Sequence, residues 1–261
     1  IFADNLYKDI IDNSSNNSTV FNAVLQNLVD QKFPVNDDMK EDAATIIKQI
    51  KSAYKSNYGD NYKDSLNQAL TSAGYKNLSE YRQKMIKQIQ YANFLLDYID
   101  DHFDDVFNDY YQQCAPKYVS LIKISVSDTS SPTDDETSKL NEVKELISNT
   151  DKSFGDIAQD YSNDSTSSKK GSLGIVDSKD TSGIANSYGK DVFNAIEALS
   201  EGQVSDVITG DNGYYFVKVT STDKKTLKKE LKKTDIDSPL LAYDDYLQYV
   251  VYNSYKINYK D

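Results

Sequence analysis

The stretch that decides the fold lies between residues 151 and 220. It opens with DKSFGDIAQDYSNDSTSSKKGSLG (151–174) and closes, after a variable middle, with VFNAIEALSEGQVSDVITGDNGYYFVKV (192–219). Ser153 and Asp156 offer a hydroxyl and a carboxylate to the free amides of a helix start. A short amphipathic helix is therefore predicted, whose apolar face holds Phe154, Ile157, Ala158 and Tyr161. Residues 162–172 contain no apolar side chain, which predicts a surface loop.

The second half of the stretch adds strands and another helix. Leu173 and Ile175 resume the apolar pattern, and a helix is predicted over about 189–199, with Gly202 just beyond it as a stop signal. The turn residues 211–213 then lead into 214–219, whose β-branched and aromatic residues favour a strand. Together these segments predict a compact αβ module.

This module resembles the parvulin family of peptidyl-prolyl isomerases. The matching positions, in register and order, are Phe154, Ala158, Tyr161, Ser162, Asp164, Gly171, Leu173, Gly174, Leu199, Gly202, Val204, Ser205, Val207, Gly213, Tyr214 and Val217. The resemblance covers most of a parvulin domain and implies its fold.

The resemblance also implies where the catalytic site should lie. Parvulins bound an apolar proline pocket with two histidines and place a Cys or Asp between them. In this chain the histidine positions fall on Tyr215 and about Lys123, whereas Asp164 matches the central position. Ser172 replaces the Asp that many parvulins carry before Leu-Gly, and the sole histidine, His102, lies outside the module.

The pocket that the resemblance implies would use Leu173, Phe193 and Tyr214 to hold substrate. The loop between Gly174 and Val192 is longer than in the family, so one wall of the pocket stays unassigned. Prolyl isomerisation needs no covalent step and no cofactor, because the enzyme only has to favour the twisted amide. Loss of two preorganised polar groups nevertheless predicts weak or absent activity.

Composition restricts the class of protein. The chain has 261 residues, of which 38% are hydrophobic and 27% charged, and its net charge is −12. An acidic balance argues against nucleic acid as a partner, and no apolar run is long enough to span a membrane. Residues 1–4 (IFAD) lack a signal peptide's basic and apolar regions, so none is expected in this numbering. The single Cys114 excludes an intrachain disulfide and a cysteine zinc site.

From residue 4 to residue 113 the pattern is helical. Helices are predicted at 4–12, from Ser18 or Thr19 onward, and at 37–56, 61–73 and 78–103. The last is the longest, and a second apolar stripe of Ile86, Phe94, Leu95 and Tyr98 widens its face, so we expect part of it to line a groove. His102 lies within DDHFDD, which we interpret as a solvated acidic surface and not as a metal site.

Pro116 separates the helices from the module, which begins with a strand at 117–126 and a helix at 134–148. The basic segment 224–233 is expected to pair with the acidic segment 97–109. Ser238 and Pro239 then start a helix carrying Tyr243, Tyr246, Tyr249 and Tyr252. The predicted fold class is α+β: residues 1–115 form a helical chaperone domain, 116–223 the inserted parvulin-like domain, and 224–261 helices that return to the helical domain.

This order of helices, parvulin and returning helix resembles the PrsA and SurA group of extracytoplasmic foldases. The resemblance implies unfolded or exported polypeptide clients and a place on the outer face of a bacterial cell. It further implies a lipid anchor upstream of Ile1, and it leaves a homodimer open.

Three functions remain after this reasoning. The first, which we expect, is a foldase-type chaperone whose parvulin module is a degenerate binding domain. The second is a working isomerase that uses Asp164, Tyr215 and an apolar pocket from Leu173 and Phe193. The third is a surface interaction protein that has reused the scaffold for a dedicated partner. No serine or cysteine triad, phosphate loop or zinc spacing in the sequence supports another class of enzyme.

Overall fold

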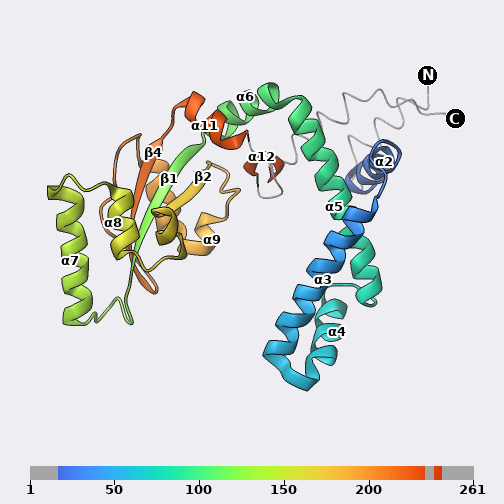
Figure 1. The fold of residues 1–261 in the computed structure, drawn as a ribbon, viewed down its shortest axis with the longest axis horizontal. Coiled ribbons are helices and arrows are strands. Elements are labelled where there is room, and N and C mark those ends of the chain that lie inside the picture. The colour runs from blue at the N-terminus through green and yellow to red at the C-terminus, as the bar shows by residue number, and fades with distance from the viewer. Residues whose placement is uncertain (1–16, 233–237, 243–261) are drawn as a thin grey trace. The chain divides into compact units, whose positions relative to one another are not determined.

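The computed structural model describes residues 17–232 and 238–242 of the chain, and these divide into two compact units (Figure 1). The first unit runs to Asp101 and the second begins at His102. The helix expected at 4–12 and the tyrosines at 243, 246, 249 and 252 lie outside the described residues.

The first unit is helical. It consists of α2 (Asn17–Lys32), α3 (Asp37–Tyr58), the 3-10 turn η1 (Gly59–Asn61), α4 (Tyr62–Ser72) and α5 (Leu78–Asp101). The Asn36 side chain accepts a hydrogen bond from the Met39 amide at 3.0 Å, and Asn77 accepts one from the Glu80 amide at 2.9 Å. These contacts satisfy free amides at the starts of α3 and α5, and they confirm the starts of the helices predicted at 37–56 and 78–103.

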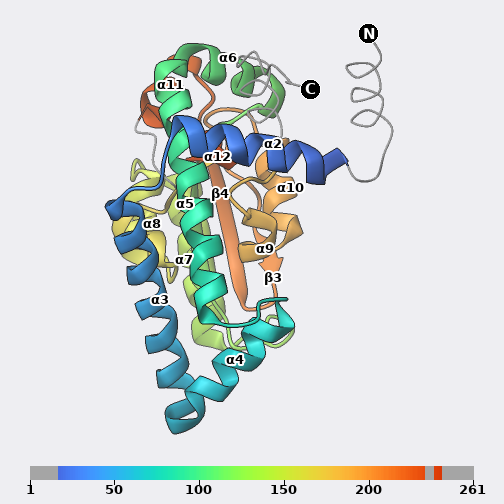
Figure 2. The ribbon, with the colours of Figure 1, turned by 90° about the vertical axis from the view of Figure 1, so that its right-hand side faces the viewer.

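The core of this unit lies between α3 and α5, which run side by side (Figure 2). Its buried residues are Met39, Ala43, Ile47, Met85, Ile86 and Ile89. Gln90 is 1% exposed, and its amide donates to the Phe33 carbonyl at 2.8 Å, so the segment between α2 and α3 is tied to α5. The predicted groove along the second stripe is wrong for Ile86, Phe94 and Leu95. All three are buried, because the face of α5 on which they lie is packed.

The second unit contains the sheet. Its elements are α6 (Phe103–Cys114), β1 (Lys117–Ser125), α7 (Asp134–Asn149), α8 (Phe154–Tyr161), η2 (Ser165–Lys169), β2 (Ser172–Val176), α9 (Ile184–Tyr188), α10 (Lys190–Ala198), β3 (Ile208–Gly210), β4 (Gly213–Ser221), α11 (Lys224–Leu231) and α12 (Pro239–Ala242). The strands pair antiparallel in the order β2-β1-β4-β3. The α+β class is confirmed, as are the strands at 117–126 and 214–219 to within two residues of each end.

Elements of this unit that were not predicted include α9 and β3. Both are short, and α9 depends on a side chain that lies before it. The Asp180 carboxylate accepts hydrogen bonds from the amides of Ile184 at 2.6 Å and Ala185 at 2.9 Å. Five residues show no helical period, so only the tertiary structure reveals this turn of helix.

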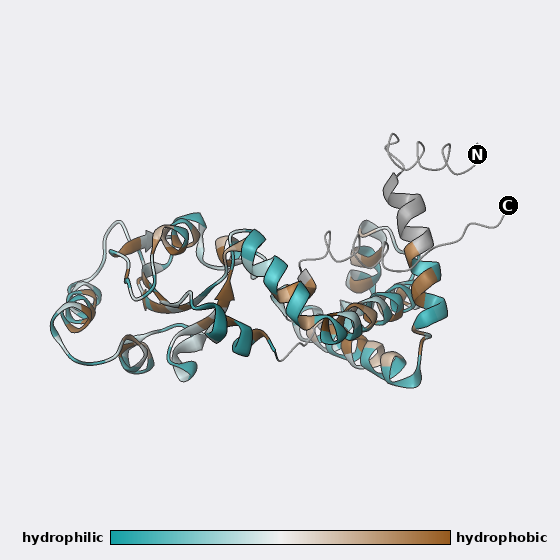
Figure 3. Ribbon diagram, turned by 90° about the horizontal axis from the view of Figure 1, so that it is seen from above, coloured by the Kyte–Doolittle hydropathy of each residue, from teal (hydrophilic) through white to brown (hydrophobic). Residues whose placement is uncertain are grey.

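The sheet has a core on each face. Leu121, Val217 and Tyr215 belong to one cluster, against which residues of α9 and α10 pack. Ile122, Ile124 and Phe216 belong to the other, which includes residues of α7 and α8. This division follows from the alternation of side chains along a strand. In Figure 3 the hydrophobic residues of the strands are brown, and helices lie on either side of the sheet.

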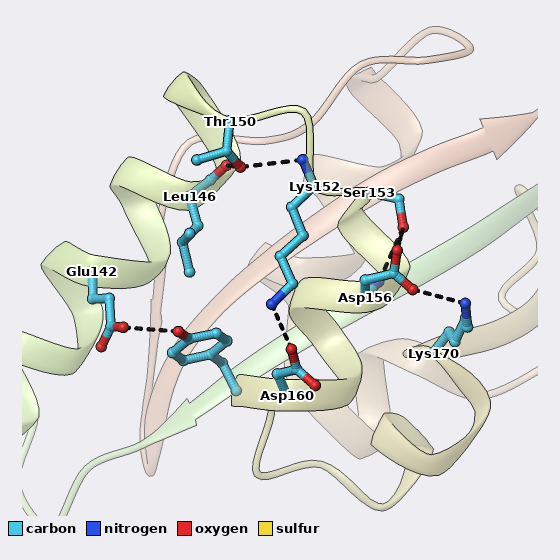
Figure 4. Close-up of polar contacts among 9 residues, drawn as sticks. Glu142, Leu146, Thr150, Lys152, Ser153, Asp156, Asp160 and Lys170 are labelled. Carbon is cyan, nitrogen blue, oxygen red and sulfur yellow. Dashed lines mark hydrogen bonds and ion pairs between the residues drawn. The ribbon is translucent and has the colours of Figure 1, made fainter.

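Polar contacts join α7 and α8 on the outside of the second core (Figure 4). The Tyr161 hydroxyl donates to the Glu142 carboxylate at 2.8 Å, and Lys152 forms an ion pair with Asp160. Ser153 accepts from the Asp156 amide at 3.1 Å, which confirms the helix start predicted from these two residues.

The division between the units corrects the predicted boundary at 115/116. Helix α6 belongs to the second unit because the Tyr110 hydroxyl donates to the buried Asp177 carboxylate at 2.7 Å, and the Tyr111 hydroxyl donates to the Thr222 carbonyl at 3.1 Å. Helix α11 also lies in this unit. Lys228 forms an ion pair with Asp104 at 2.8 Å, which confirms the expected pairing of the basic and acidic segments and lowers the pKa of Asp104.

We predict that a fragment of residues 102–243 is more stable than one of residues 116–222. The shorter fragment lacks Tyr110, so the buried Asp177 loses a hydrogen-bond donor, a loss that costs about 1–3 kcal/mol. Urea denaturation followed by circular dichroism measures the difference. Tyr110→Phe in the longer fragment is the matched control and should reproduce part of it. Equal midpoints for the two fragments would contradict the assignment of α6 to this unit.

Candidate functional site

The pairing of β1 with β4 brings together the two residues that stand at the expected histidine positions. Lys123 lies directly opposite Tyr215 in the register of the two strands. The Lys123 ammonium is 5.7 Å from the centroid of the Tyr215 ring, within the range of a cation–π interaction. Tyr215 is only 3% exposed, so most of its ring belongs to the core.

Asp164 reaches the same place through the loop after α8. The Lys123 amide donates to the Ser162 hydroxyl at 3.0 Å, and its carbonyl accepts from the Asn163 amide at 2.8 Å. These bonds hold the loop along β1. Asp164 itself precedes η2, and its carboxylate accepts from the amide and hydroxyl of Thr166 at 2.9 and 2.6 Å. The carboxylate is thus fixed in direction by its own local turn.

Gly171 allows the far end of this loop to pass close to β1. Its φ is +75°, and a Cβ built there would lie 2.4 Å from the Leu121 carbonyl oxygen. At this close approach the Leu121 amide also donates a hydrogen bond to the Gly171 carbonyl at 2.8 Å. Only glycine combines this backbone conformation with so close an approach. Gly171 therefore helps position the loop that carries Asp164.

Tyr188 completes the site and was not predicted. It is the last residue of α9, and its hydroxyl lies 3.4 Å from the Asp164 carboxylate oxygen Oδ1. Its ring meets the Tyr215 ring edge to face, with 6.2 Å between the centroids. Tyr188 thus fills space between Asp164 and Tyr215. The sequence signal that could have found it is an aromatic residue directly before the glycine that starts α10.

The Tyr215 hydroxyl turns toward the hairpin between β3 and β4. It donates to the Asn212 side chain at 2.7 Å. A Cβ on Gly210 would lie 2.6 Å from the Tyr215 ring, so the hairpin needs glycine at that position. A cleft of about 430 Å³ opens beside the ring, lined by residues 185–192 and 208–212. The site therefore adjoins open surface on the side of α9 and β3.

Of the three residues expected to bind substrate, two pack on the same side of the sheet as Tyr215 and one does not, and the substrate contact of all three stays a prediction. Leu173 and Phe193 are half-buried and pack against the core cluster that contains Tyr215. The prediction for Tyr214 is wrong. Neighbouring residues of a strand point to opposite faces, so Tyr214 packs against the other core, and its hydroxyl lies 3.4 Å from the Thr129 carbonyl.

Burial and nearby carboxylates raise the pKa of both phenols of the site. Burial, followed by the negative charge of Asp164, raises the pKa of Tyr188 to about 12. Burial and the charges of Asp164 and Asp211 also raise the pKa of Tyr215. At physiological pH both side chains are therefore hydrogen-bond donors and neither is a base. The arrangement offers two phenols, one carboxylate and one ammonium beside apolar Leu173 and Phe193.

Nothing in the described part of the chain indicates a metal site. No cluster of three or more His, Cys, Asp or Glu side chains there is placed to hold an ion. Cys114 is buried, and burial raises the pKa of its thiol to about 11. His102 directly precedes α6, apart from the sheet residues of the site.

Comparison with known proteins finds a family model that matches the part of the chain containing this site. Residues 121–221 match the family model of the rotamases, described as the PPIC-type PPIASE domain. This chain contains a PPIC-type peptidyl-prolyl isomerase domain. The match begins within β1 and ends with β4, so it includes Lys123, Asp164, Tyr188 and Tyr215. The resemblance to parvulins is confirmed.

Curated relatives carry the name "Foldase protein PrsA". Those of Staphylococcus epidermidis and Staphylococcus aureus are each 32% identical over 130 residues, which is 47% of this chain and 37% and 38% of the relatives. The matched part thus spans little more than a third of their length. The resemblance to the PrsA foldases is confirmed to that extent.

Solved structures similar to this chain include two PrsA proteins. The foldase protein PrsA of Streptococcus pneumoniae is 20% identical with a TM-score of 0.44, and the likeness covers 100% of this chain and 92% of that one. PrsA of Bacillus subtilis is 22% identical with a TM-score of 0.40, and the likeness covers 98% of this chain and 89% of that one.

In the described ranges, every helix is too short or too polar to cross a membrane.

We predict that Tyr188 makes the protein unstable in alkali. Because its pKa in the folded state, about 12, exceeds the value of about 10 in an unfolded chain, the folded state holds the proton more tightly. The contribution of Tyr188 to the free energy of unfolding is therefore fully present below about pH 10 and is lost as the pH rises toward 12. Denaturation at a series of pH values should show a steeper alkaline decline for the wild type than for Tyr188→Phe. Tyr58→Phe, at a tyrosine that is 53% exposed, is the control and should behave like the wild type.

Proposed function

We propose that this chain is an extracytoplasmic foldase-type chaperone that binds unfolded or exported polypeptides. In this proposal the PPIC-type domain binds chain segments but has little isomerase activity. The observation that carries the proposal is the position of Tyr188, whose hydroxyl lies 3.4 Å from the Asp164 carboxylate and whose ring meets the Tyr215 ring edge to face. In this proposal the Tyr188 side chain occupies the space that an isomerase would offer to a proline. The names of the curated relatives support the foldase part.

Weak catalysis follows from what the site offers. Isomerisation is accelerated when fixed dipoles stabilise the twisted amide in a dry pocket. Here the Asp164 carboxylate is already used by Thr166, and the Tyr215 hydroxyl donates to Asn212. The Tyr215 hydroxyl must give up Asn212 before it can donate to a substrate, and the hydrogen bonds to Asp164 Oδ1 hold that carboxylate in its own turn. Such a site is better suited to holding a chain than to twisting it.

A working isomerase is the second candidate, and one observation favours it. Two phenols, Tyr188 and Tyr215, lie in the same core as the apolar side chains of Leu173 and Phe193, and a phenol can donate a hydrogen bond to a twisted amide. If Tyr188 moved aside on binding, these donors would face the amide of a bound proline. A surface interaction protein with a dedicated partner is the third candidate.

The place of action belongs to the same proposal. We infer a location on the outer face of a bacterial cell, with a lipid anchor upstream of Ile1, from the resemblance to PrsA and SurA foldases. Nucleic acid is not an expected partner, because the chain carries a net charge of −12. A homodimer is compatible with the proposal.

We predict that prolyl isomerisation of a short peptide, followed by NMR exchange, is slow with this protein. Asp164→Ala should change the rate less than about twofold, because its carboxylate serves its own turn, whereas loss of a catalytic dipole typically costs about 10²-fold. Asp206→Ala, at an exposed carboxylate outside the cleft lining, is the matched control. A rate like that of an active parvulin, abolished by Asp164→Ala, would establish the second candidate.

Tyr188→Ala separates occlusion from catalysis. If Tyr188 occupies the proline position, its removal should strengthen binding of a proline peptide, because space is opened beside Asp164 and Tyr215. If its hydroxyl acts on the substrate, removal should abolish the remaining isomerisation. Peptide titration and the exchange assay on the same variant distinguish these results.

We further predict that the full chain suppresses aggregation of a denatured model protein, and that the fragment 102–243 alone protects less. A chaperone that accepts many sequences needs broad surface, and the first unit supplies helices that the fragment lacks. Light scattering during dilution from denaturant measures the effect, and circular dichroism confirms that the fragment is folded. Equal protection by the fragment would place client binding in the second unit. No protection by either would favour the dedicated-partner candidate.

A further inference from the structure

A groove in the helical unit combines an apolar floor with a cationic rim. It has a volume of about 480 Å³ and lies between α3 and the start of α5. Ala44, Ile47 and Leu78 form the floor. Among the residues that the structure describes, the charged ones of the lining are Lys48, Lys51 and Arg82, and none of the lining residues is acidic. In a chain of net charge −12, this local excess of positive charge runs against the overall balance.

The helical period explains why these residues converge. On α3, residues 44, 48 and 51 are spaced by four and three, so they share one face, and Ile47 lies beside them toward the core. On α5, Leu78 and Arg82 are one turn apart. The two helices thus each contribute both an apolar residue and a cation. Leu78 is half-buried, whereas the three cations are exposed.

The cations of this groove are not used by the fold. Among the described residues, neither lysine nor Arg82 forms an ion pair, whereas Lys40 and Lys87 of the same helices do. Arg82 makes one contact of 3.5 Å to the Lys40 carbonyl, a neutral acceptor. The nearby Glu80 carboxylate is engaged by the Lys76 amide at 2.7 Å. The three positive charges are therefore available to an outside anion.

The start of α5 adds to the positive potential. Leu78 and Ser79 are the first residues of a helix of 24 residues, so its positive end borders the groove. The Asn77 side chain occupies only the Glu80 amide among the first amides. The positive potential of the helix end adds to that of the three side chains, and it is confined to the first turn of α5.

We propose that this groove binds polypeptide segments of another protein in which an acidic side chain stands next to a large apolar one. The apolar side chain would lie against Ala44, Ile47 and Leu78, and the carboxylate would be held by Lys48, Lys51 and Arg82. The inference rests on the proposed client-binding function and deepens it, since it names the class of segment that the helical unit prefers. Charge complementarity is the argument for this occupant.

The test uses the full chain and two short fluorescein-labelled peptides, one of leucine and aspartate and its counterpart with asparagine in place of aspartate. Fluorescence anisotropy should show tighter binding of the aspartate peptide, and added salt should remove the difference. The variant Lys48→Gln/Lys51→Gln/Arg82→Gln should bind the aspartate peptide about tenfold more weakly, as expected for three exposed charge contacts. Its affinity for the asparagine peptide should not change.

The matched control is Lys55→Gln/Lys63→Gln/Lys84→Gln, which removes the same charge from exposed positions of α3, α4 and α5 outside the groove. It should bind both peptides like the wild type. Equal weakening by the control would reduce the effect to net charge and overturn the proposal. Equal affinity of the wild type for the two peptides would overturn it as well.

Two further outcomes separate this inference from the proposed function. If both peptides bind and aggregation is suppressed without any preference for aspartate, only the groove assignment fails. If the chain neither binds peptide nor suppresses aggregation, the chaperone proposal fails with it. Sedimentation of the wild type, the triple variant and the control variant tests whether a second copy of this chain occupies the groove. A dimer that is lost only in the triple variant would show that it does and would overturn the proposal.

Discussion

The antiparallel pairing of β1 with β4 is the constraint on which the second unit depends. The two strands lie far apart in sequence, yet they pair from Tyr118 and Ser221 to Ser125 and Gly213. This register sets Lys123 opposite Tyr215 and assigns Leu121 and Val217 to one core and Ile122 and Phe216 to the other. A shift of one residue would exchange the two faces and disperse the site.

The parvulin-like domain has a sheet and helices in the expected places, although Lys123 and Tyr215 stand at the two positions where the family has histidines. Asp164 serves its own turn, Tyr215 bonds to the hairpin, and Tyr188 occupies the space between them. Each group is satisfied by a neighbour within the domain. Preorganised catalytic groups differ in that their partner is the substrate, so internal satisfaction favours rigidity over catalysis.

The helical unit divides its charges between two uses. Lys40 and Lys87 are neutralised by Asp37 and Asp30, whereas Lys48, Lys51 and Arg82 gather around an apolar floor without such partners in the described chain. Ion pairs of exposed side chains contribute little to stability, so their presence or absence does not decide the fold. The distribution of charge affects what the surface attracts, and Lys48, Lys51 and Arg82 give one small area of the helical unit a positive charge that runs against the net charge of the chain.

The sequence by itself determined the elements that have a period or a cap. The helix start at Ser153 and the strand at 117–126 are local properties of this kind. Lys123, Asp164 and Tyr215 were expected at the site from the parvulin resemblance, and their role there stays a prediction. Tertiary structure alone decided three matters. Tyr188 joins the site because a five-residue helix carries it there, Tyr214 leaves it because strand neighbours face opposite cores, and α6 joins the second unit because Tyr110 reaches the buried Asp177. The first and the third depend on contacts between residues distant in sequence, which a pattern of neighbours along the chain does not contain. The alternation that separates Tyr214 from Tyr215 is present in the sequence, but only the packing of the two cores shows which face each side chain takes.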